Sequence, residues 1–587
     1  TLNNRKGFLH MKKKLLPALI VTGLIILVVI IMGITALINK YTPTKKTEDL
    51  KEYFNISSDD EAALIVDNEL SDYKAKIIDK KIYVDYKFVH DSLNSRFYWD
   101  ANENVLLYTT ASDIISAAAD SNSYSVTKQT NDFGYPIVKA TSDSALIALD
   151  YVKQYSNITF KSYDDPARIV ITSKWDEIDS ATVSKSTQVR VKGGIKSPIL
   201  KEVKKDDKIT ILDSGDKWDK VATEDGVIGY IKRKDLSESK KTKLTNPDYE
   251  EETFTHIKKD KDICLAWNQV TSQSANSKVP QIISSTKGIN VMSPTWFYLN
   301  DNNGNLADIA SKDYVSYCHS QGIEVWGLFS NFENTDVDAA YVLTHTSTRT
   351  TLINQIMSAA FNYELDGVNI DFENITEAAY GDSYIEFIRE LAIKCHNNGI
   401  SLSVDVTVPA SFNKFFNRSD MANFADYIVI MGYDEHYKGS DAGSVSSIPW
   451  VTEGVESTLK EVPADQIILG MPFYTRIWEL TPKEDDDAVT DTEDQSKYTV
   501  ASQVYSMDAA AAQLATNNAT TALDEESGQN YAEWSASNKL YKVWLEDSTS
   551  LEKRLKLVDD NKLAGAAFWK LGFENSSVWD TVIKYLN

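Results

Sequence analysis

The segment Leu365-Asp366-Gly367-Val368-Asn369-Ile370-Asp371-Phe372-Glu373 carries most of the architectural information in this chain. Alternate side chains of a β-strand point to the same face, so the segment has one polar and one apolar face. The polar face holds Asn369, Asp371 and Glu373, and the apolar face holds Val368, Ile370 and Phe372. An edge strand with solvated charges is the alternative, but it would leave the apolar face uncovered. The pattern therefore predicts a barrel strand whose C-terminal end enters a functional site.

The two carboxyl groups at the end of this strand suggest acid–base chemistry. Asp371 and Glu373 are two residues apart, which places them roughly 6–7 Å from each other along a strand. Like charges at that separation cannot both ionise freely, so one carboxyl is pushed toward its protonated form. We assign the general acid to Glu373. Asp366 points to the opposite face, and we expect a structural role for it.

The C-terminal region, residues 260–587, alternates strands with helices and predicts an α/β fold, a (β/α)8 TIM barrel. Eight strands are expected: Ile263 to Trp267, Ile289 to Ser293, Glu324 to Ser330, Gly367 to Glu373, Leu402 to Val408, Tyr427 to Tyr433, Ile467 to Phe473 and Ala564 to Trp569. In the fifth, Ser401, Ser403, Asp405 and Thr407 share one face. The long gap before the eighth strand predicts an inserted α+β subdomain at about 477–545.

The segment around Asp371 resembles the active-site signature D-x-x-D-x-D-x-E of family 18 glycoside hydrolases, the chitinase-like enzymes. Asn369 stands where that family usually has Asp. Similar D-G-V-N-I-D-F-E segments resemble those of spore-cortex N-acetylglucosaminidases. The resemblance implies substrate-assisted hydrolysis with retention, in which the N-acetyl oxygen of the sugar attacks the anomeric carbon. Glu373 would then protonate the glycosidic oxygen, and Asp371 would orient the acetamido group.

The resemblance also implies roles at other strand ends. Met431-Gly432-Tyr433-Asp434 is similar to the family's M-x-Y-D motif, so the Tyr433 hydroxyl would steer the N-acetyl carbonyl. Trp569 would form the floor of the subsite by stacking on a pyranose. The remaining expected substrate contacts are Asn369, Asp434, Tyr474, Arg476 and Trp544. Trp296 and Phe297 fit a core or a sugar platform equally well, and His436 and Asp485-Asp486-Asp487 are expected in solvated loops.

The N-terminus predicts one transmembrane helix. Residues 15–38 carry no charge over 24 positions, which is long enough to cross a bilayer. Five basic residues precede this run and three follow it shortly afterwards, which favours an inside N-terminus for residues 1–14 and export of the rest. We expect a single-pass membrane anchor with the barrel on the cell-wall side. A cleaved signal peptide and a secreted protein are the alternative.

Two modules are expected between the anchor and the barrel. After a linker at 39–60, residues 61–176 contain an internal repeat with an offset of 63, in which Phe97 to Thr109 aligns with Phe160 to Thr172. This resembles the small α/β repeat at the N-terminus of copper amine oxidases, without a His cluster for copper, and predicts a two-repeat stalk. Residues 181–237 resemble a bacterial Src-homology-3-like barrel, which is either a wall-binding module or a passive spacer. A second linker covers 238–259.

Composition narrows the partners. The formal net charge of −24 repels phosphates and argues against nucleic acid. Cys264, Cys318 and Cys395 suit neither a disulfide framework nor a zinc site, so we expect three buried hydrophobic side chains, no metal and no cofactor. We predict a monomeric β-N-acetylglucosaminidase acting on peptidoglycan. A chitinase, an enzyme releasing N-glycans, and a non-catalytic glycan-binding protein are the alternatives.

Overall fold

A computed structural model describes residues 3–373, 375, 378–483 and 494–586. The acidic run at 485–487 lies outside the described residues. The chain divides into two compact units, which are described separately. One comprises Thr1–Asn94 with Thr141–Glu251, and the other comprises Ser95–Ala140 with Glu252–Asn587.

The second unit is built on a closed barrel of eight parallel strands. Their order is β20-β33-β27-β26-β25-β24-β23-β21, and a pairing of β20 with β21 closes the ring. The strands are β20 (Ile263–Asn268), β21 (Val291–Leu299), β23 (Glu324–Ser330), β24 (Gly367–Asp371), β25 (Ser401–Thr407), β26 (Tyr427–Met431), β27 (Ile467–Pro472) and β33 (Gly565–Trp569), with β22 (Leu306–Asp308) added at β21. All eight expected strands are present, which confirms the TIM barrel.

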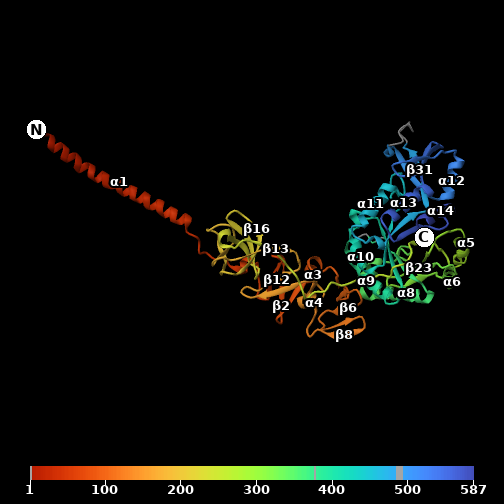
Figure 1. The fold of residues 1–587 in the computed structure, drawn as a ribbon, viewed down its shortest axis with the longest axis horizontal. Coiled ribbons are helices and arrows are strands. Elements are labelled where there is room, and N and C mark those ends of the chain that lie inside the picture. Colours follow the sequence, from red (N-terminus) through yellow and green to blue (C-terminus); the bar gives the residue numbers. More distant parts are fainter. Residues whose placement is uncertain (1–2, 374, 376–377, 484–493, 587) are drawn as a thin grey trace. The chain divides into compact units, whose positions relative to one another are not determined.

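Helices surround the barrel in the green-to-blue part of Figure 1. They are α5 (Val279–Ser284), α6 (Lys312–Ser320), α7 (Ala339–Thr344), α8 (Thr346–Tyr363), α9 (Ala378–His396), α10 (Arg418–Phe424), α11 (Ile448–Thr458), α13 (Ser548–Asp560) and α14 (Val578–Tyr585). Helix α8 ends at Glu364, whose φ of 58° turns the chain into β24. Because that strand alternates, Val368, Ile370 and Phe372 are buried in the large apolar cluster that includes the helices. The polar alternates therefore face the barrel interior.

The insertion predicted before the eighth strand is an α+β element. Its sheet has the order β29-β28-β32-β31-β30, and α12 (Met507–Thr516) accompanies it. The strands are β28 (Tyr474–Pro482), β29 (Tyr498–Ser506), β30 (Ala522–Asp524), β31 (Gln529–Ala536) and β32 (Lys539–Leu545). The insertion starts directly after β27, so Tyr474 and Arg476 lie close to a barrel strand end.

A second sheet of this unit comes from far upstream in the sequence. It has the order β4 (Phe97–Asp100), β5 (Val105–Thr109), β6 (Ile114–Ala118), β7 (Ser123–Val126) and β8 (Gln129–Asp132), and β9 (Val138–Ala140) follows it. The sheet contacts α9 through a hydrogen bond between Tyr98 Oη and Ser383 Oγ at 2.9 Å and another from Thr109 Oγ1 to Glu386 Oε1 at 2.8 Å. It thus covers the outer, helical side of the barrel.

The first unit begins with helix α1 (Asn3–Tyr41), in which Pro17–Tyr41 has a mean hydropathy of 2.9 and is long enough to cross a membrane. A sheet follows with the order β11-β12-β1-β2-β3-β10. Its elements are β1 (Glu61–Val66), β2 (Glu69–Ile78), β3 (Lys81–Asp85), β10 (Ala145–Ala148), β11 (Thr159–Tyr163) and β12 (Arg168–Thr172), with helices α2 (Leu50–Tyr53), α3 (Tyr86–Ser92) and α4 (Leu149–Gln154).

The two copies of the internal repeat share their local order of elements, β3-α3-β4-β5 and β10-α4-β11-β12. Their hairpins, however, enter different sheets. The hairpin of the second copy joins β1, which pairs in parallel with β12, whereas the hairpin of the first copy starts the sheet β4 to β8. The sequence repeat therefore describes a local unit and not two equivalent halves of one sheet.

A seven-stranded antiparallel sheet completes the first unit, in the order β15-β14-β18-β17-β16-β13-β19. Its strands are β13 (Glu177–Thr182), β14 (Thr187–Arg190), β15 (Ile199–Val203), β16 (Lys208–Asp213), β17 (Trp218–Thr223), β18 (Ile228–Lys232) and β19 (Lys240–Lys243). It shares one apolar cluster with Phe54, Ala63 and Ile65 of the preceding sheet, and Arg168 pairs with Asp225 at 2.5 Å. The two expected modules thus have a common core.

Candidate active site

Asn369 is the centre of a buried hydrogen-bond network inside the barrel. Its Oδ1 accepts from Trp267 Nε1 at 2.9 Å and from Ser293 Oγ at 3.0 Å. Its Nδ2 donates to Ser403 Oγ at 3.0 Å and to Asp405 Oδ1 at 2.7 Å. Because β24 lies beside β25 with Asn369 opposite Ser403, strand register brings these groups together. Asn369 thus links four strands of the barrel floor.

Asp371 follows on the same face and is almost completely buried. Burial raises the pKa of its carboxyl well above the usual range, and the charges of Asp405, Glu373 and Glu333 raise it further. Its Oδ1 has no hydrogen-bond partner within the described part of the chain. The group therefore favours its protonated form until a substrate supplies a partner.

Glu373 lies just beyond the end of β24. Its side chain reaches open space, yet protein surrounds it on most sides, so lost hydration raises the pKa of its carboxyl. The charges of Asp434 and Glu333 raise that pKa further. Asn331 holds the neighbouring backbone, because its Nδ2 donates to Glu373 O at 2.7 Å. A carboxyl that is accessible and retains its proton suits a general acid.

Tyr433 and Asp434 follow β26 at the same end of the barrel. Burial, followed by the charges of Asp371 and Asp405, raises the pKa of the Tyr433 hydroxyl well above its usual value, so it stays a donor. Asp434 has a φ of 62°, a conformation that Asp tolerates. Tyr474 Oη donates to Asp434 Oδ1 at 2.5 Å, and Arg476 Nη2 lies 3.8 Å from the same oxygen. Four of the expected residues thus converge here.

Trp569 ends β33 and joins a row of aromatic rings. Its ring centroid lies 6.0 Å from that of Trp267, which lies 6.5 Å from Tyr433, which in turn lies 6.2 Å from Tyr474. All these rings meet edge to face. Trp569 is partly exposed beside the acidic groups, which suits a surface for stacking on a sugar ring.

Other candidates lie apart from the acidic groups. The Trp544 ring centroid lies 4.8 Å from that of Tyr531, and its Nε1 donates to Asp524 Oδ2 at 3.0 Å, so both contacts are internal to the insertion. Trp296 is fully buried and donates to Asn276, so it is a core residue, as is Phe297. His436 bonds the Ser444 carbonyl at 2.8 Å. Asp366 bonds His319 and the Val325 amide, a structural position.

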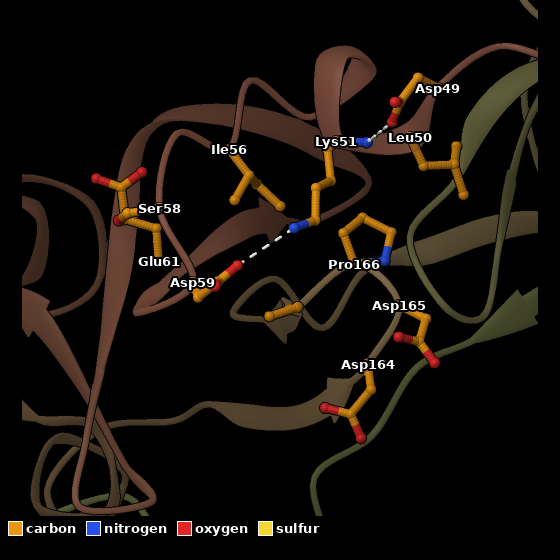
Figure 2. A pocket seen from close by; sticks show the side chains of 11 residues that line it. Asp49, Leu50, Lys51, Ile56, Ser58, Asp59, Glu61, Asp164, Asp165 and Pro166 are labelled. Atoms are coloured by element: carbon orange, nitrogen blue, oxygen red, sulfur yellow. Dashed lines mark hydrogen bonds and ion pairs between the residues drawn. The ribbon is translucent and has the colours of Figure 1, made fainter.

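No group of His, Cys, Asp and Glu suited to a metal ion occurs among the described residues. All three cysteines are buried and free, as predicted. A cavity of about 610 Å³ lies in the other unit, where acidic side chains of Asp49, Asp59 and Asp164 surround it. Figure 2 shows Lys51 reaching across it to Asp59 at 3.3 Å. Nothing in that cavity resembles the convergent donors at the barrel mouth.

Residues 331–574 match the model of the glycosyl hydrolases family 18. The chain carries a family 18 glycosyl hydrolase domain. It is 24% identical over 301 residues to the uncharacterized glycosylase YvbX of Bacillus subtilis (strain 168), covering 48% of this chain and 81% of YvbX. It is 24% identical over 287 residues to the cortical fragment-lytic enzyme of the same organism, covering 47% of this chain and 63% of that enzyme.

Two solved structures are among those to which this chain is similar. The spore cortex-lytic enzyme SleL of Bacillus megaterium QM B1551 aligns with a TM-score of 0.48 at 19% identity, covering 59% of this chain and 77% of SleL. A chitinase of Chromobacterium violaceum ATCC 12472 aligns with a TM-score of 0.48 at 20% identity, covering 55% of this chain and 98% of the chitinase.

Several groups of this candidate site were not predicted from the sequence. Glu333 follows β23 and accepts from Ser330 Oγ at 2.6 Å, and Trp267, Ser293 and Asp405 contact Asn369. A signal existed for Asp405, because the alternation in its strand already placed it on the polar face. The partners Trp267 and Ser293 lie in apolar strands and give no such signal.

Proposed function

We propose that this enzyme hydrolyses the β-1,4 linkage after N-acetylglucosamine in peptidoglycan, by substrate-assisted catalysis with retention. The observation that carries the proposal is the position of Glu373, an accessible carboxyl with a raised pKa at the end of β24, next to buried Asp371. Similarity to cortical fragment-lytic enzymes favours a cell-wall glycan over chitin.

The geometry supports one sequence of steps. Glu373 gives its proton to the glycosidic oxygen, and the C1–O bond breaks as the acetamido carbonyl oxygen of the sugar forms a bond to C1. Tyr433 donates a hydrogen bond to that carbonyl, and Asp371 accepts the acetamido N–H. Water then attacks C1 and opens the oxazolinium ring, and the Glu373 carboxylate takes the proton of that water. Two inversions at C1 give net retention.

The enzyme class can be tested with purified substrates. The chain and its Glu373→Gln variant are incubated with peptidoglycan and with chitin oligomers, and the new reducing ends are reduced and identified by mass spectrometry. N-acetylglucosamine at the new reducing end of peptidoglycan is expected, and only for the parent. N-acetylmuramic acid there would contradict the bond assignment. Products from chitin alone would indicate a chitinase, and binding without products would indicate a glycan-binding protein.

Substrate assistance has its own test. Glycan in which the N-acetyl groups are replaced by free amines should bind but turn over very slowly, because the attacking carbonyl oxygen is missing. Equal rates on both glycans would indicate an enzyme nucleophile instead.

We also propose that Pro17–Tyr41 anchors the enzyme in the membrane with the barrel on the wall side. The apolar length and the basic residues before it support this topology. Anchoring would hold the barrel near its substrate at high effective concentration. Protease added to intact cells should degrade the barrel and leave a small membrane-bound fragment. Full-length barrel in the medium, starting near Asn39, would indicate a cleaved signal instead.

A further inference from the structure

The orientation of the Asn369 amide is fixed by its neighbours. The Trp267 indole N–H can only donate, so the Asn369 oxygen must face it. The Asn369 Nδ2 group must then face β25, where it donates to Ser403 and, at 2.7 Å, to Asp405. The side chain therefore presents a donor to the Asp405 carboxylate.

This orientation makes positions 369 and 405 complementary. A carboxylate at position 369, as in the family pattern, would place an oxygen 2.7 Å from an Asp405 oxygen, where two negative charges repel strongly. An amide at 369 instead stabilises the ionised Asp405. The amide of Asn369 and the carboxyl of Asp405 are therefore complementary. The carboxyl group beside Asp371 is that of Asp405, on the neighbouring strand β25, and not one at position 369.

Asp405 acts on the carboxyl of Asp371, the group that an Asp at position 369 would also face. Among the charges that raise the pKa of Asp371, Asp405 comes first. Burial and the charge of Glu373 raise the pKa of Asp405 itself, while the bond from Asn369 lowers it. The charges of Asp371 and Asp405 also raise the pKa of the hydroxyl groups of Tyr433, which follows β26, and of Tyr384 on α9. No described Lys, Arg or His forms an ion pair with Asp371, Glu373 or Asp405, so no cation screens their repulsion.

We propose that Asp405 is a positioning residue that supplies from β25 the carboxylate partner of Asp371 which the family pattern places at position 369 on β24. The two carboxyls share one proton, with Asn369 favouring the charge on Asp405 and the proton on Asp371. Glu373 keeps its own proton for the leaving oxygen, so the proton balance of the hydrolysis is unchanged. This inference rests on the proposed function.

The first test is the isosteric Asp405→Asn variant, assayed on the glycan that the parent cleaves. The Asp405 charge opposes ionisation of Glu373 as well as of Asp371. Without it, Glu373 should lose the proton that it gives to the glycosidic oxygen at lower pH, so the alkaline limb of the pH–rate profile should move to lower pH. We expect kcat to fall roughly tenfold or more, as for about one pKa unit of lost coupling, and KM to change little. An unchanged alkaline limb with kcat within about twofold of the parent would overturn the proposal.

The second test exchanges the two groups. Asn369→Asp alone sets two carboxylates against each other and should be less active than the parent at neutral pH. Combined with Asp405→Asn it restores one carboxyl and one amide, so the double variant should recover most of the lost kcat and the parental alkaline limb. A double variant no more active than the single ones would refute the electrostatic pairing.

A third readout needs no activity and so separates this inference from the proposed function. The raised pKa values make the folded protein hold protons that the unfolded chain releases above about pH 4, so the pair destabilises the fold as pH rises. The Tm of Asp405→Asn relative to the parent should therefore be higher at pH 7 than at pH 4. Asp336→Asn, which removes an exposed acid of the same unit, should show no such trend. Equal differences for Asp405→Asn at both pH values would contradict the pairing.

Discussion

The barrel domain contains two groups of acidic side chains that differ in their partners. The helix cluster comprises Arg349 on α8, Glu386, Arg389 and Glu390 on α9, and Asp420 on α10. Its arginines pair with each acid: Arg349 with Glu390 at 2.9 Å, and Arg389 with Glu386 at 3.0 Å and with Asp420. The strand cluster comprises Asp371 on β24, Glu373 just beyond that strand and Asp405 on β25, and no described cation pairs with any of them.

The difference separates structure from chemistry. Burial of an acid costs free energy that an arginine partner offsets, so the helix cluster can join α8, α9 and α10 beneath the sheet β4 to β8. Without a cationic partner, the acids of the strand cluster hold their protons to higher pH than free carboxyl groups do. Under the proposed function, acids without a cationic partner mark the end of the barrel where the reaction occurs, and acids paired with arginine hold the surrounding helices together.

Among changes to the strand cluster, the largest effect on kcat is expected for Glu373→Gln. The substitution keeps size and hydrogen bonding but removes the transferable proton, so kcat should fall about 10²–10⁴-fold. Tm should stay near the parental value and glycan should still bind. Hydrolysis within a few-fold of the parent would show that another group is the acid.

A comparable free-energy change is expected on the helix side, but in stability. Arg389→Met leaves Glu386 and Asp420 buried without their cation, which should lower the free energy of unfolding by about 3–5 kcal/mol. Denaturant unfolding measures this loss. The kcat of the protein that remains folded should match the parent, and a specific loss of kcat would place Arg389 in the catalytic machinery.

The sequence predicted the positions of the residues in the strand cluster far better than the pairings in the helix cluster. The alternation around Asp371 and the eight apolar strands were sufficient to predict the barrel and the position of Glu373 at the end of β24, because period and spacing are local properties. Asp405 was on the expected face, but its bond to Asn369 depends on the register of β24 against β25, which no local pattern encodes. Arg349 and Arg389 sit in ordinary helical sequence, and the repeat at Phe97 did not reveal which sheet its hairpin joins.

A smaller loss of kcat is expected when a neighbour of the strand cluster loses one hydrogen-bond donor. Tyr433→Phe removes the hydroxyl that would steer the acetamido carbonyl, which should cost about 1.5–3 kcal/mol, or roughly 10- to 150-fold in kcat. The deacetylated glycan provides the control, because its slow residual turnover should not depend on Tyr433. Equal losses on both substrates would point to a packing defect.

The smallest effect is expected for Tyr474→Phe. Its hydroxyl bonds Asp434 at 2.5 Å, and loss of one such bond should cost about 0.5–1.5 kcal/mol, roughly 2- to 12-fold in kcat/KM. Steady-state kinetics with the parental substrate would measure it. A loss as large as that for Glu373→Gln would mean that Tyr474 touches the reacting atoms.

If cationic partners decide the role of a buried acid, removing one acid from each cluster should have opposite effects on kcat and Tm. Asp371→Asn removes one acidic group from the strand cluster, and Glu390→Gln removes one from the helix cluster. The kcat and Tm of both variants are measured at neutral pH. Asp371→Asn should lose kcat while its Tm stays equal or rises, because repulsion is relieved. Glu390→Gln should keep kcat while its Tm falls, because Arg349 loses its anion. A lower Tm with unchanged kcat in Asp371→Asn, together with a lower kcat with unchanged Tm in Glu390→Gln, would show that the partners do not decide these roles.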